Sequence, residues 1–127
     1  MKRLTNLSNL KIAVFGQGYV GLPMAVLLAK NGIKTIGIEK NEQIVDDFKN
    51  GKIKTSFGNL AEKIKKLYDD NMYDLVLGVD NISNIDVGII SVQTPLTSDD
   101  KPNLTFVLEA IKDFLSIAKK NSILIIE

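Results

Sequence analysis

Short apolar runs alternate with longer amphipathic segments along the 127-residue chain. Continuous apolar runs are typical of strands that are buried on both faces, whereas apolar residues three or four positions apart favour helices. The pattern predicts strands at residues 12–15, 34–38, within 72–79, 86–92 and 122–127. It predicts helices at residues 20–31, 41–50, 59–70 and 104–119. Because helices alternate with strands, we expect right-handed crossovers and one parallel sheet.

Residues with special backbone preferences mark the ends of the predicted helices. Gly32 suits the left-handed conformation that closes the first helix, and Asn41 can cap the start of the second. Helical spacing also predicts which residues face inward. These are Leu60, Ile64 and Leu67 in the third helix, and Val107 or Leu108 with Ile111 and Leu115 in the fourth.

A glycine-rich segment joins the first strand to the first helix. Gly16, Gly18 and Gly21 have the spacing G-x-G-x-x-G. Gly16 can take the tight turn out of the strand, Gly18 lets the backbone approach a ligand closely, and Gly21 lets the helix pack close to the sheet. The helix points its free N–H groups and the positive end of its dipole at the same place. The segment therefore predicts a pyrophosphate-binding site.

A carboxylate follows the second predicted strand. Glu39 lies 18 residues after Gly21, near the spacing expected for the acidic residue that binds the adenosine ribose of a dinucleotide. Its charge would repel a 2′-phosphate, so the sequence favours NAD over NADP as the cofactor. Lys40 is adjacent and would soften that repulsion.

These elements together predict a Rossmann-type, doubly wound α/β fold, with residues 1–10 as a polar lead-in and residues 11–127 as one NAD-binding domain. The expected strand order is 3-2-1-4-5, and the cofactor should lie where that order reverses. The loop after Phe15 and the loop after Val92 should therefore meet. For Thr94, in the second loop, position leaves two interpretations equal: contact with the cofactor, or ordinary turn chemistry before Pro95.

Composition narrows the chemistry that the chain can perform. Lys and Arg number 16 and Asp and Glu number 15, so the charge balance indicates neither a nucleic-acid nor a membrane partner. The absence of cysteine and histidine excludes disulfides, the usual zinc sites, a cysteine nucleophile and the commonest general base near neutral pH. We predict no metal site. No apolar run has transmembrane length and the N-terminus lacks a signal-peptide core, so we expect a cytoplasmic location.

Three motifs give the chain a resemblance to a known family. They are Gly16-Gln-Gly-Tyr-Val-Gly-Leu-Pro-Met-Ala, Ser91-Val-Gln-Thr-Pro-Leu and Lys101-Pro-Asn-Leu-Thr-Phe-Val. In order and spacing they resemble the N-terminal NAD-binding domain of the UDP-glucose/GDP-mannose dehydrogenases, over nearly the whole chain. Thr94-Pro-Leu and the short loop after it are most similar to the UDP-N-acetylhexosamine 6-dehydrogenase branch.

The resemblance implies cofactor contacts beyond the three glycines and Glu39. It assigns to the dinucleotide phosphates Gln17, Tyr19 and Val20, and to the opposite wall of the cofactor site Val92, Thr94 and Pro95. The chain departs from the usual family residues at Gln17 (leucine), Glu39 (aspartate), Gln93 (proline) and Asn103 (aspartate). We expect Gln17 to add a polar group beside the pyrophosphate.

The resemblance also implies the function of a larger protein. In the family, two successive hydride transfers to NAD convert the C6 alcohol of a sugar nucleotide, here UDP-N-acetylhexosamine or UDP-glucose, to a carboxylate. The catalytic cysteine, the dimer-forming helices and the sugar-binding domain all lie beyond the position of Glu127. We therefore expect this chain to be an inactive, NAD-binding part of a homodimeric enzyme, with no catalytic residue of its own.

Two other functions remain open from the sequence. A stand-alone NAD(H)-sensing regulatory domain would have a similar length and the same glycine motif. The first domain of another dehydrogenase, such as one acting on a 3-hydroxy acid, would share the fold. The last predicted strand is apolar from Ile123 to Ile126 and lies at the edge of the sheet, so we also expect self-association through it.

Overall fold

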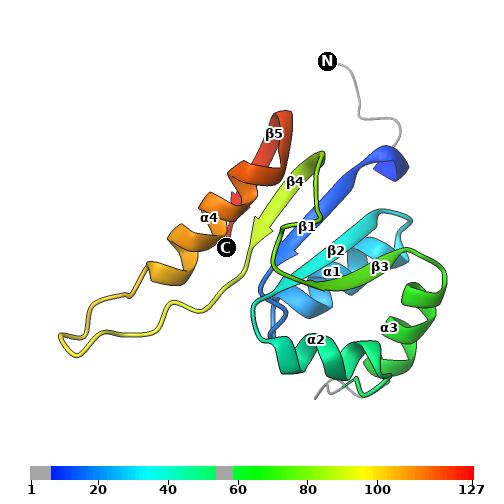
Figure 1. Ribbon diagram of the computed structural model, residues 1–127, viewed down its shortest axis with the longest axis horizontal. Coiled ribbons are helices and arrows are strands. Elements are labelled where there is room, and N and C mark those ends of the chain that lie inside the picture. Colours follow the sequence, from blue (N-terminus) through cyan, green and yellow to red (C-terminus); the bar gives the residue numbers. More distant parts are fainter. Residues whose placement is uncertain (1–6, 54–58) are drawn as a thin grey trace.

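The computed structural model describes residues 7–53 and 59–127. Its strands form one sheet in the order β3-β2-β1-β4-β5, as predicted, and neighbouring strands are parallel (Figure 1). The strands are β1 (Lys11–Phe15), β2 (Lys34–Glu39), β3 (Tyr73–Leu77), β4 (Ile85–Ile90) and β5 (Ala118–Ile126). The order reverses between β1 and β4, so the chain leaves their carboxyl ends in opposite directions and opens a crevice there.

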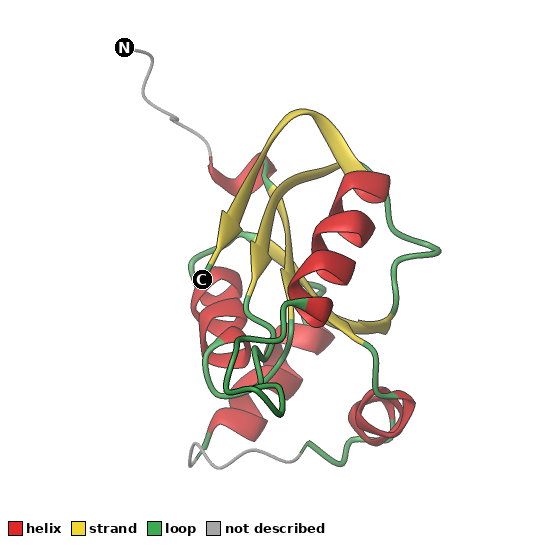
Figure 2. Cartoon of the chain, turned by 90° about the vertical axis from the view of Figure 1, so that its left-hand side faces the viewer, coloured by secondary structure: helices red, strands yellow, loops and turns green. Residues whose placement is uncertain are grey.

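Helices lie on both sides of the sheet (Figure 2). They are α1 (Gly21–Lys30), α2 (Glu42–Lys49), α3 (Leu60–Asp69) and α4 (Thr105–Ile117), preceded by a 3₁₀ turn at Leu7–Asn9. Buried residues of α1, α2 and α3 form one apolar core with the sheet, and those of α4 form a second core on the opposite face. Within the part of the chain that the structure describes, no helix is long and apolar enough to cross a membrane.

The predicted helix-end residues act as expected. Gly32 has a φ of 84°, and its N–H donates a hydrogen bond to the carbonyl of Ala29 at 3.1 Å. The Asn41 side chain accepts a hydrogen bond from the backbone N–H of Gln43 at 3.0 Å, at the start of α2. Both contacts satisfy backbone groups that a helix leaves unpaired at its ends.

The buried face of α4 differs from the prediction. Leu115, expected on the inner face, is 68% exposed, so that prediction is wrong. Of the two alternatives Val107 and Leu108, it is Val107 that packs against the core. The fully buried residues of this helix are Ala110, Phe114 and Ile117.

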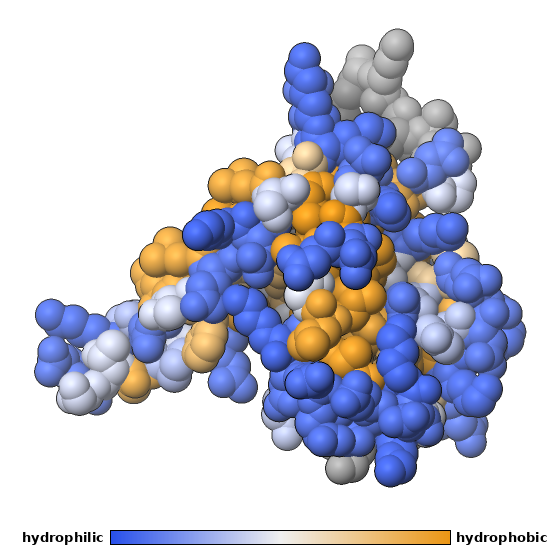
Figure 3. All heavy atoms as spheres, in the orientation of Figure 1, coloured by the Kyte–Doolittle hydropathy of each residue, from blue (hydrophilic) through white to orange (hydrophobic). Residues whose placement is uncertain are grey.

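Phe114 sets the rotation of α4 over the sheet. Its ring lies against Gly88 of β4, where any side chain would overlap it, and it meets the ring of Phe15 edge-on at a centroid distance of 6.5 Å. Burying this ring turns a second apolar stripe of the same helix outward, which leaves hydrophobic surface over α4 (Figure 3). That exposed stripe consists of Leu104, Leu108 and Leu115.

The ends of the last two strands also differ from the prediction. β4 ends at Ile90, so residues 91 and 92 have already left the sheet. β5 begins at Ala118, directly after α4, but its pairing with β4 shifts register before Ile123, and Asn121 has a φ of 63°. Regular pairing resumes at Ile123, one residue after the predicted start at residue 122. The predicted lead-in at 1–10 falls partly outside the described residues.

Candidate functional site

The turn after β1 has no room for a side chain at its first glycine. Gly16 has a φ of 90°, and a Cβ atom there would overlap the backbone carbonyl of Ser91. The N–H of Gly16 donates to the carbonyl of Ile38 at 3.2 Å, and the N–H of Ser91 donates to the carbonyl of Phe15 at 2.8 Å. The turn is thus fixed between the carboxyl ends of β2 and β4.

The other two glycines of the motif have different surroundings. A Cβ on Gly21 would overlap the carbonyl oxygen of Gly16, so α1 starts in direct contact with the turn. Nothing lies within 4 Å of a Cβ built on Gly18. The tight turn, the close helix packing and the open approach predicted for these glycines are therefore all present. Contact with a ligand stays a prediction.

The start of α1 carries an uncompensated positive dipole. Within α1, which the structure describes completely, no side chain caps the N-terminus and the first turn holds no acidic residue. Tyr19 and Val20, just before the helix, are largely exposed. They lie beside the glycine turn, but they are not among the residues that line the cavity described below. Their predicted contact with phosphates remains a prediction.

The side chain of Gln17 points into the protein. Its Nε2 atom donates to the carbonyls of Val14 and Gly16 at 3.1 and 3.0 Å, and its Oε1 atom accepts a hydrogen bond from the Tyr73 hydroxyl at 2.8 Å. The amide is therefore paired with groups of the protein, and the expectation that it lies beside the pyrophosphate stays a prediction. Residue 17 still lines the cavity, so we keep it among the proposed phosphate contacts through its backbone.

Two features of the sheet make this arrangement possible. Gly37 of β2 leaves the space, because a Cβ there would lie 2.6 Å from Oε1 of Gln17 and 2.8 Å from the Tyr73 hydroxyl. Tyr73 is 2% exposed, and burial raises its pKa above the usual value, with the charges of Asp74 and Glu39 adding to the shift. The hydroxyl is thus held as a neutral donor. The sequence signal that could have predicted this close approach, which is a glycine inside an apolar strand, was not used.

A cavity of about 640 Å³ opens beside the glycine turn, and we call it the glycine cavity. It lies at the carboxyl ends of β1, β2 and β4, so the loops after Phe15 and after β4 meet as predicted. The residues that sequence reasoning missed come from α2, the loop after β4, and α4. The lining is Phe15, Gly16, Gln17, Gly18, Ile38, Glu39, Lys40, Asn41, Ile44, Ser91, Val92, Gln93, Phe106, Glu109 and Ala110.

Glu39 and Lys40 form the end of this cavity at β2. Oε1 of Glu39 accepts hydrogen bonds from the backbone N–H groups of Lys40 and Asn41 at 2.9 and 3.2 Å. The ammonium of Lys40 lies 2.8 Å from Oε2 of Glu109 and 3.6 Å from Oδ2 of Asp113, both on α4. The hydrogen bond to Glu109 raises the pKa of Lys40, and the charge of Asp113 adds to the effect.

The first residues of the loop after β4 line the cavity, and the residues that follow them are exposed to solvent. Val92 lines the cavity and packs against the second core. Thr94 and Pro95 are exposed and are not part of the lining. The Pro95 carbonyl accepts a hydrogen bond from the N–H of Asn103 at 2.7 Å, which joins the two ends of the loop 95–103. Their assignment to the cofactor wall remains a prediction.

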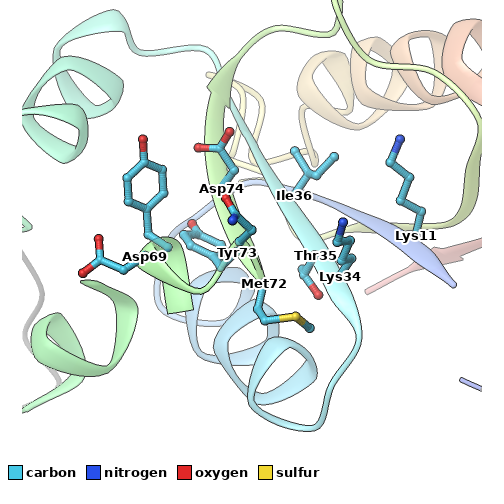
Figure 4. Close-up of a pocket in the computed structure, with 10 residues that line it drawn as sticks. Lys11, Lys34, Thr35, Ile36, Asp69, Met72, Tyr73 and Asp74 are labelled. Atoms are coloured by element: carbon cyan, nitrogen blue, oxygen red, sulfur yellow. The ribbon is translucent and has the colours of Figure 1, made fainter. Parts of the chain in front are cut away.

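A second cavity, of about 470 Å³, lies at the amino ends of the strands, opposite the end at which the glycine turn lies (Figure 4). Its lining comes from the first residues of β1, β2 and β3 and from the turn after α3. Three charged groups of the lining are already paired: Lys11 donates to the carbonyl of Ser83, Asp69 pairs with Lys65, and Asp74 pairs with Lys49. Since ligands of open α/β sheets bind at the carboxyl ends of strands, the glycine cavity is the candidate site.

Comparison with known proteins assigns the family. Residues 10–127 match the model of the UDP-glucose/GDP-mannose dehydrogenase family, NAD binding domain. The chain belongs to this family. Its resemblance to the family, inferred from three motifs, is confirmed, and the matched domain is the one that binds NAD. Among the residues that the structure describes, no cluster of acidic side chains suitable for a metal ion is present.

Relatives within the family are named UDP-N-acetyl-D-mannosamine dehydrogenase. The protein of this name from Methanococcus maripaludis strain C7 is 30% identical over 131 residues, which cover 100% of this chain and 30% of the relative. The Campylobacter jejuni protein is 33% identical over 118 residues, which cover 92% of this chain and 28% of the relative. These names agree with the predicted UDP-N-acetylhexosamine branch.

Solved structures lead to the same group. The UDP-N-acetyl-mannosamine dehydrogenase of Pyrococcus horikoshii superposes with a TM-score of 0.86 at 28% identity, covering 93% of this chain and 28% of that chain. The enzyme of the same name from Staphylococcus aureus gives a TM-score of 0.83 at 29% identity, covering 92% and 28%. This family domain therefore spans less than a third of the length of the relatives that it matches.

Proposed function

We propose that the chain binds NAD in the glycine cavity and serves as the cofactor-binding domain of a nucleotide-sugar 6-dehydrogenase. The observation that carries the proposal is that the glycine turn, Glu39 and the loop after β4 line one cavity at the reversal of the strand order. The family match supports the same cofactor. On this proposal residues 11–127 act as one NAD-binding unit.

The glycine turn fits the diphosphate of the cofactor. The open space at Gly18 admits an anion against the backbone, and the start of α1, which no side chain caps, directs its positive dipole at the same place. Gly16 and Gly21 hold the turn in this shape through contacts that leave no room for side chains. The proposed phosphate contacts are Gly16, Gln17, Gly18, Tyr19, Val20 and Gly21.

Glu39 fits the adenosine ribose. Its Oε1 atom is oriented by two backbone N–H groups, which leaves Oε2 to accept hydrogen bonds from a sugar diol. Ile44 and Phe106 are partly exposed apolar residues of the same cavity, from opposite sides of the sheet. They supply the apolar surface that an adenine ring requires. Val92, Thr94 and Pro95 are proposed for the nicotinamide side.

The reaction of the whole protein is proposed from its relatives. Bound NAD supplies a hydride acceptor. We propose that the whole enzyme, a cytoplasmic homodimer, oxidises the C6 alcohol of a UDP-sugar, such as a UDP-N-acetylhexosamine, to a carboxylate in two such transfers. A covalent cysteine step is impossible for this chain, because it has no cysteine. Its residues bind and orient the cofactor.

Calorimetric titration of the 127-residue chain with NAD tests the proposal. We expect saturable binding by the wild type and loss of binding in Gly18→Val. A side chain at Gly18 meets open space, so the variant should fold normally while its methyl groups occupy the path of the diphosphate. Its thermal unfolding midpoint serves as the control. A folded wild-type chain that does not bind NAD at millimolar concentration would refute the proposal.

A further inference from the structure

The ion pairs of Lys40 bear on which dinucleotide the cavity accepts, an inference that rests on the proposed function. Lys40 follows the residue proposed to bind the adenosine ribose, and among the described residues that line the cavity it is the only lysine or arginine. An exposed lysine at this place would attract the 2′-phosphate of NADP. The sequence alone therefore suggests a weakened preference for NAD.

The structure gives that ammonium two other partners. Glu109 and Asp113 are one helical turn apart on α4, and their carboxylates lie 2.8 and 3.6 Å from the Lys40 ammonium. Glu109 also lines the cavity. Two carboxylates therefore pair with a single ammonium, and Glu39 adds a third negative charge to the lining, so the local charge stays negative with Lys40 in place.

We propose that Glu109 and Asp113 are specificity-determining residues, which hold Lys40 away from the adenosine ribose and make the cavity select NAD over NADP. A 2′-phosphate carries a charge between about −1.5 and −2 at neutral pH, by analogy with phosphorylated side chains. It would meet the charges of Glu39 and Glu109, which line the same cavity, and it would compete with the carboxylates of α4 for Lys40. The ribose hydroxyls of NAD are neutral and meet no such opposition.

Calorimetric titrations with NAD and with NADP measure this selectivity as the ratio of the two dissociation constants. In Glu109→Gln/Asp113→Asn, Lys40 is released and two repelling charges are removed. We expect the NADP to NAD ratio of dissociation constants to fall about tenfold, because each exposed charge pair contributes only modestly and two pairs are broken. Adding Lys40→Gln to this variant should abolish most of the gain.

A matched control separates the local effect from net charge. Asp69→Asn/Asp70→Asn also removes two carboxylates that pair with lysines, but these lie on and after α3, outside the glycine cavity. The control should leave the ratio unchanged. In the wild type, added salt should narrow the gap between the two dinucleotides, because exposed charges are screened.

Each outcome decides between the two proposals. If the wild type binds NAD but the ratio is unchanged in Glu109→Gln/Asp113→Asn, or changes equally in the control, the specificity inference is wrong and the proposed function stands. If the folded wild type binds no NAD, both are overturned. A gain in NADP affinity that survives the loss of Lys40 would also overturn the role given to this lysine.

Discussion

The hydroxyl of Tyr73 donates a 2.8 Å hydrogen bond to Oε1 of Gln17, across 56 residues of sequence. Tyr73 stands on β3, two strands away from the glycine turn that contains Gln17. The amide nitrogen of Gln17 in turn binds the carbonyls of Val14 and Gly16. A buried phenol at one edge of the sheet therefore helps to fix the shape of the turn proposed to bind the diphosphate.

Removing this hydroxyl should weaken NAD binding. In Tyr73→Phe, Gln17 loses the donor to its Oε1 atom and can rotate, so the glycine turn is less well fixed. A net contribution of 0.5–1.5 kcal/mol for one hydrogen bond predicts a loss of affinity of about three- to tenfold. Calorimetric titration of the wild type and Tyr73→Phe with NAD, well below their unfolding temperatures, measures the loss.

The double variant Tyr73→Phe/Gln17→Leu tests how far the turn depends on Gln17 itself. It also removes the hydrogen bonds from Nε2 of Gln17 to the carbonyls of Val14 and Gly16, so it should bind NAD more weakly than Tyr73→Phe alone. Equal affinity of Tyr73→Phe and the wild type would show that the hydroxyl does not position the turn.

Tyr73 should also make the domain less stable at alkaline pH. Burial raises its pKa in the folded state, above the value of about 10 for an unperturbed tyrosine. Above that pH the unfolded chain loses the phenol proton while the folded chain keeps it, so the free energy of unfolding falls as pH rises. Between the pKa values of Tyr73 in the unfolded and folded states, this one residue should lower the free energy of unfolding by about 1.4 kcal/mol per pH unit.

Urea denaturation of the wild type and Tyr73→Phe between pH 8 and about 11 isolates this effect. The wild type should lose more stability than the variant over that range, because all other titrating groups are common to both. If the free energies of unfolding of the wild type and Tyr73→Phe fell equally with pH, the loss of stability could not be assigned to the ionisation of Tyr73.

The rotation of α4 can be tested by truncating two neighbouring residues. Phe114→Ala removes a ring that is 2% exposed and lies against Gly88, so it should lower the free energy of unfolding by about 3–5 kcal/mol. Leu115→Ala truncates an exposed residue of the same helix and should change it by less than about 0.5 kcal/mol. Similar losses in both variants would support the inner face expected from the sequence.

The edge strand β5 should mediate self-association. Ile123, Ile125 and Ile126 are about half exposed, and among the described residues no strand pairs with the outer edge of β5. Light scattering should show an apparent mass that rises with concentration, and Ile123→Lys/Ile125→Lys should suppress the rise. Leu27→Lys, which adds a charge at an exposed leucine of α1, is the control and should have little effect.

The sequence predicted features that depend on neighbouring residues. The glycine turn, the Asn41 cap and the strand order all follow from short patterns and from the handedness of crossovers. The contacts that were missed join distant segments: Gln17 with Tyr73, and Lys40 with Glu109, which lies 69 residues away. No local pattern specifies which of several polar groups such a side chain will meet.

Leu115 was placed on the wrong face of α4 for a different reason, whereas Val107 and Ile111 do pack against the core as predicted. This helix carries apolar residues on two sides, so helical spacing alone could not tell the buried stripe from the exposed one. The decision came from Gly88, since only a strand residue without a side chain leaves space for Phe114. Shape across the interface between helix and sheet, rather than hydrophobicity, selected the orientation.

Gly37 limits how this family domain can vary. Any larger residue there would push aside the ends of the Gln17 and Tyr73 side chains. Across homologous sequences we therefore expect these three positions to change together: a methyl group gained at position 37 should accompany a shorter residue at position 17 or 73. The residue at position 17 of the glycine turn would then depend on the residue at position 73, two strands away.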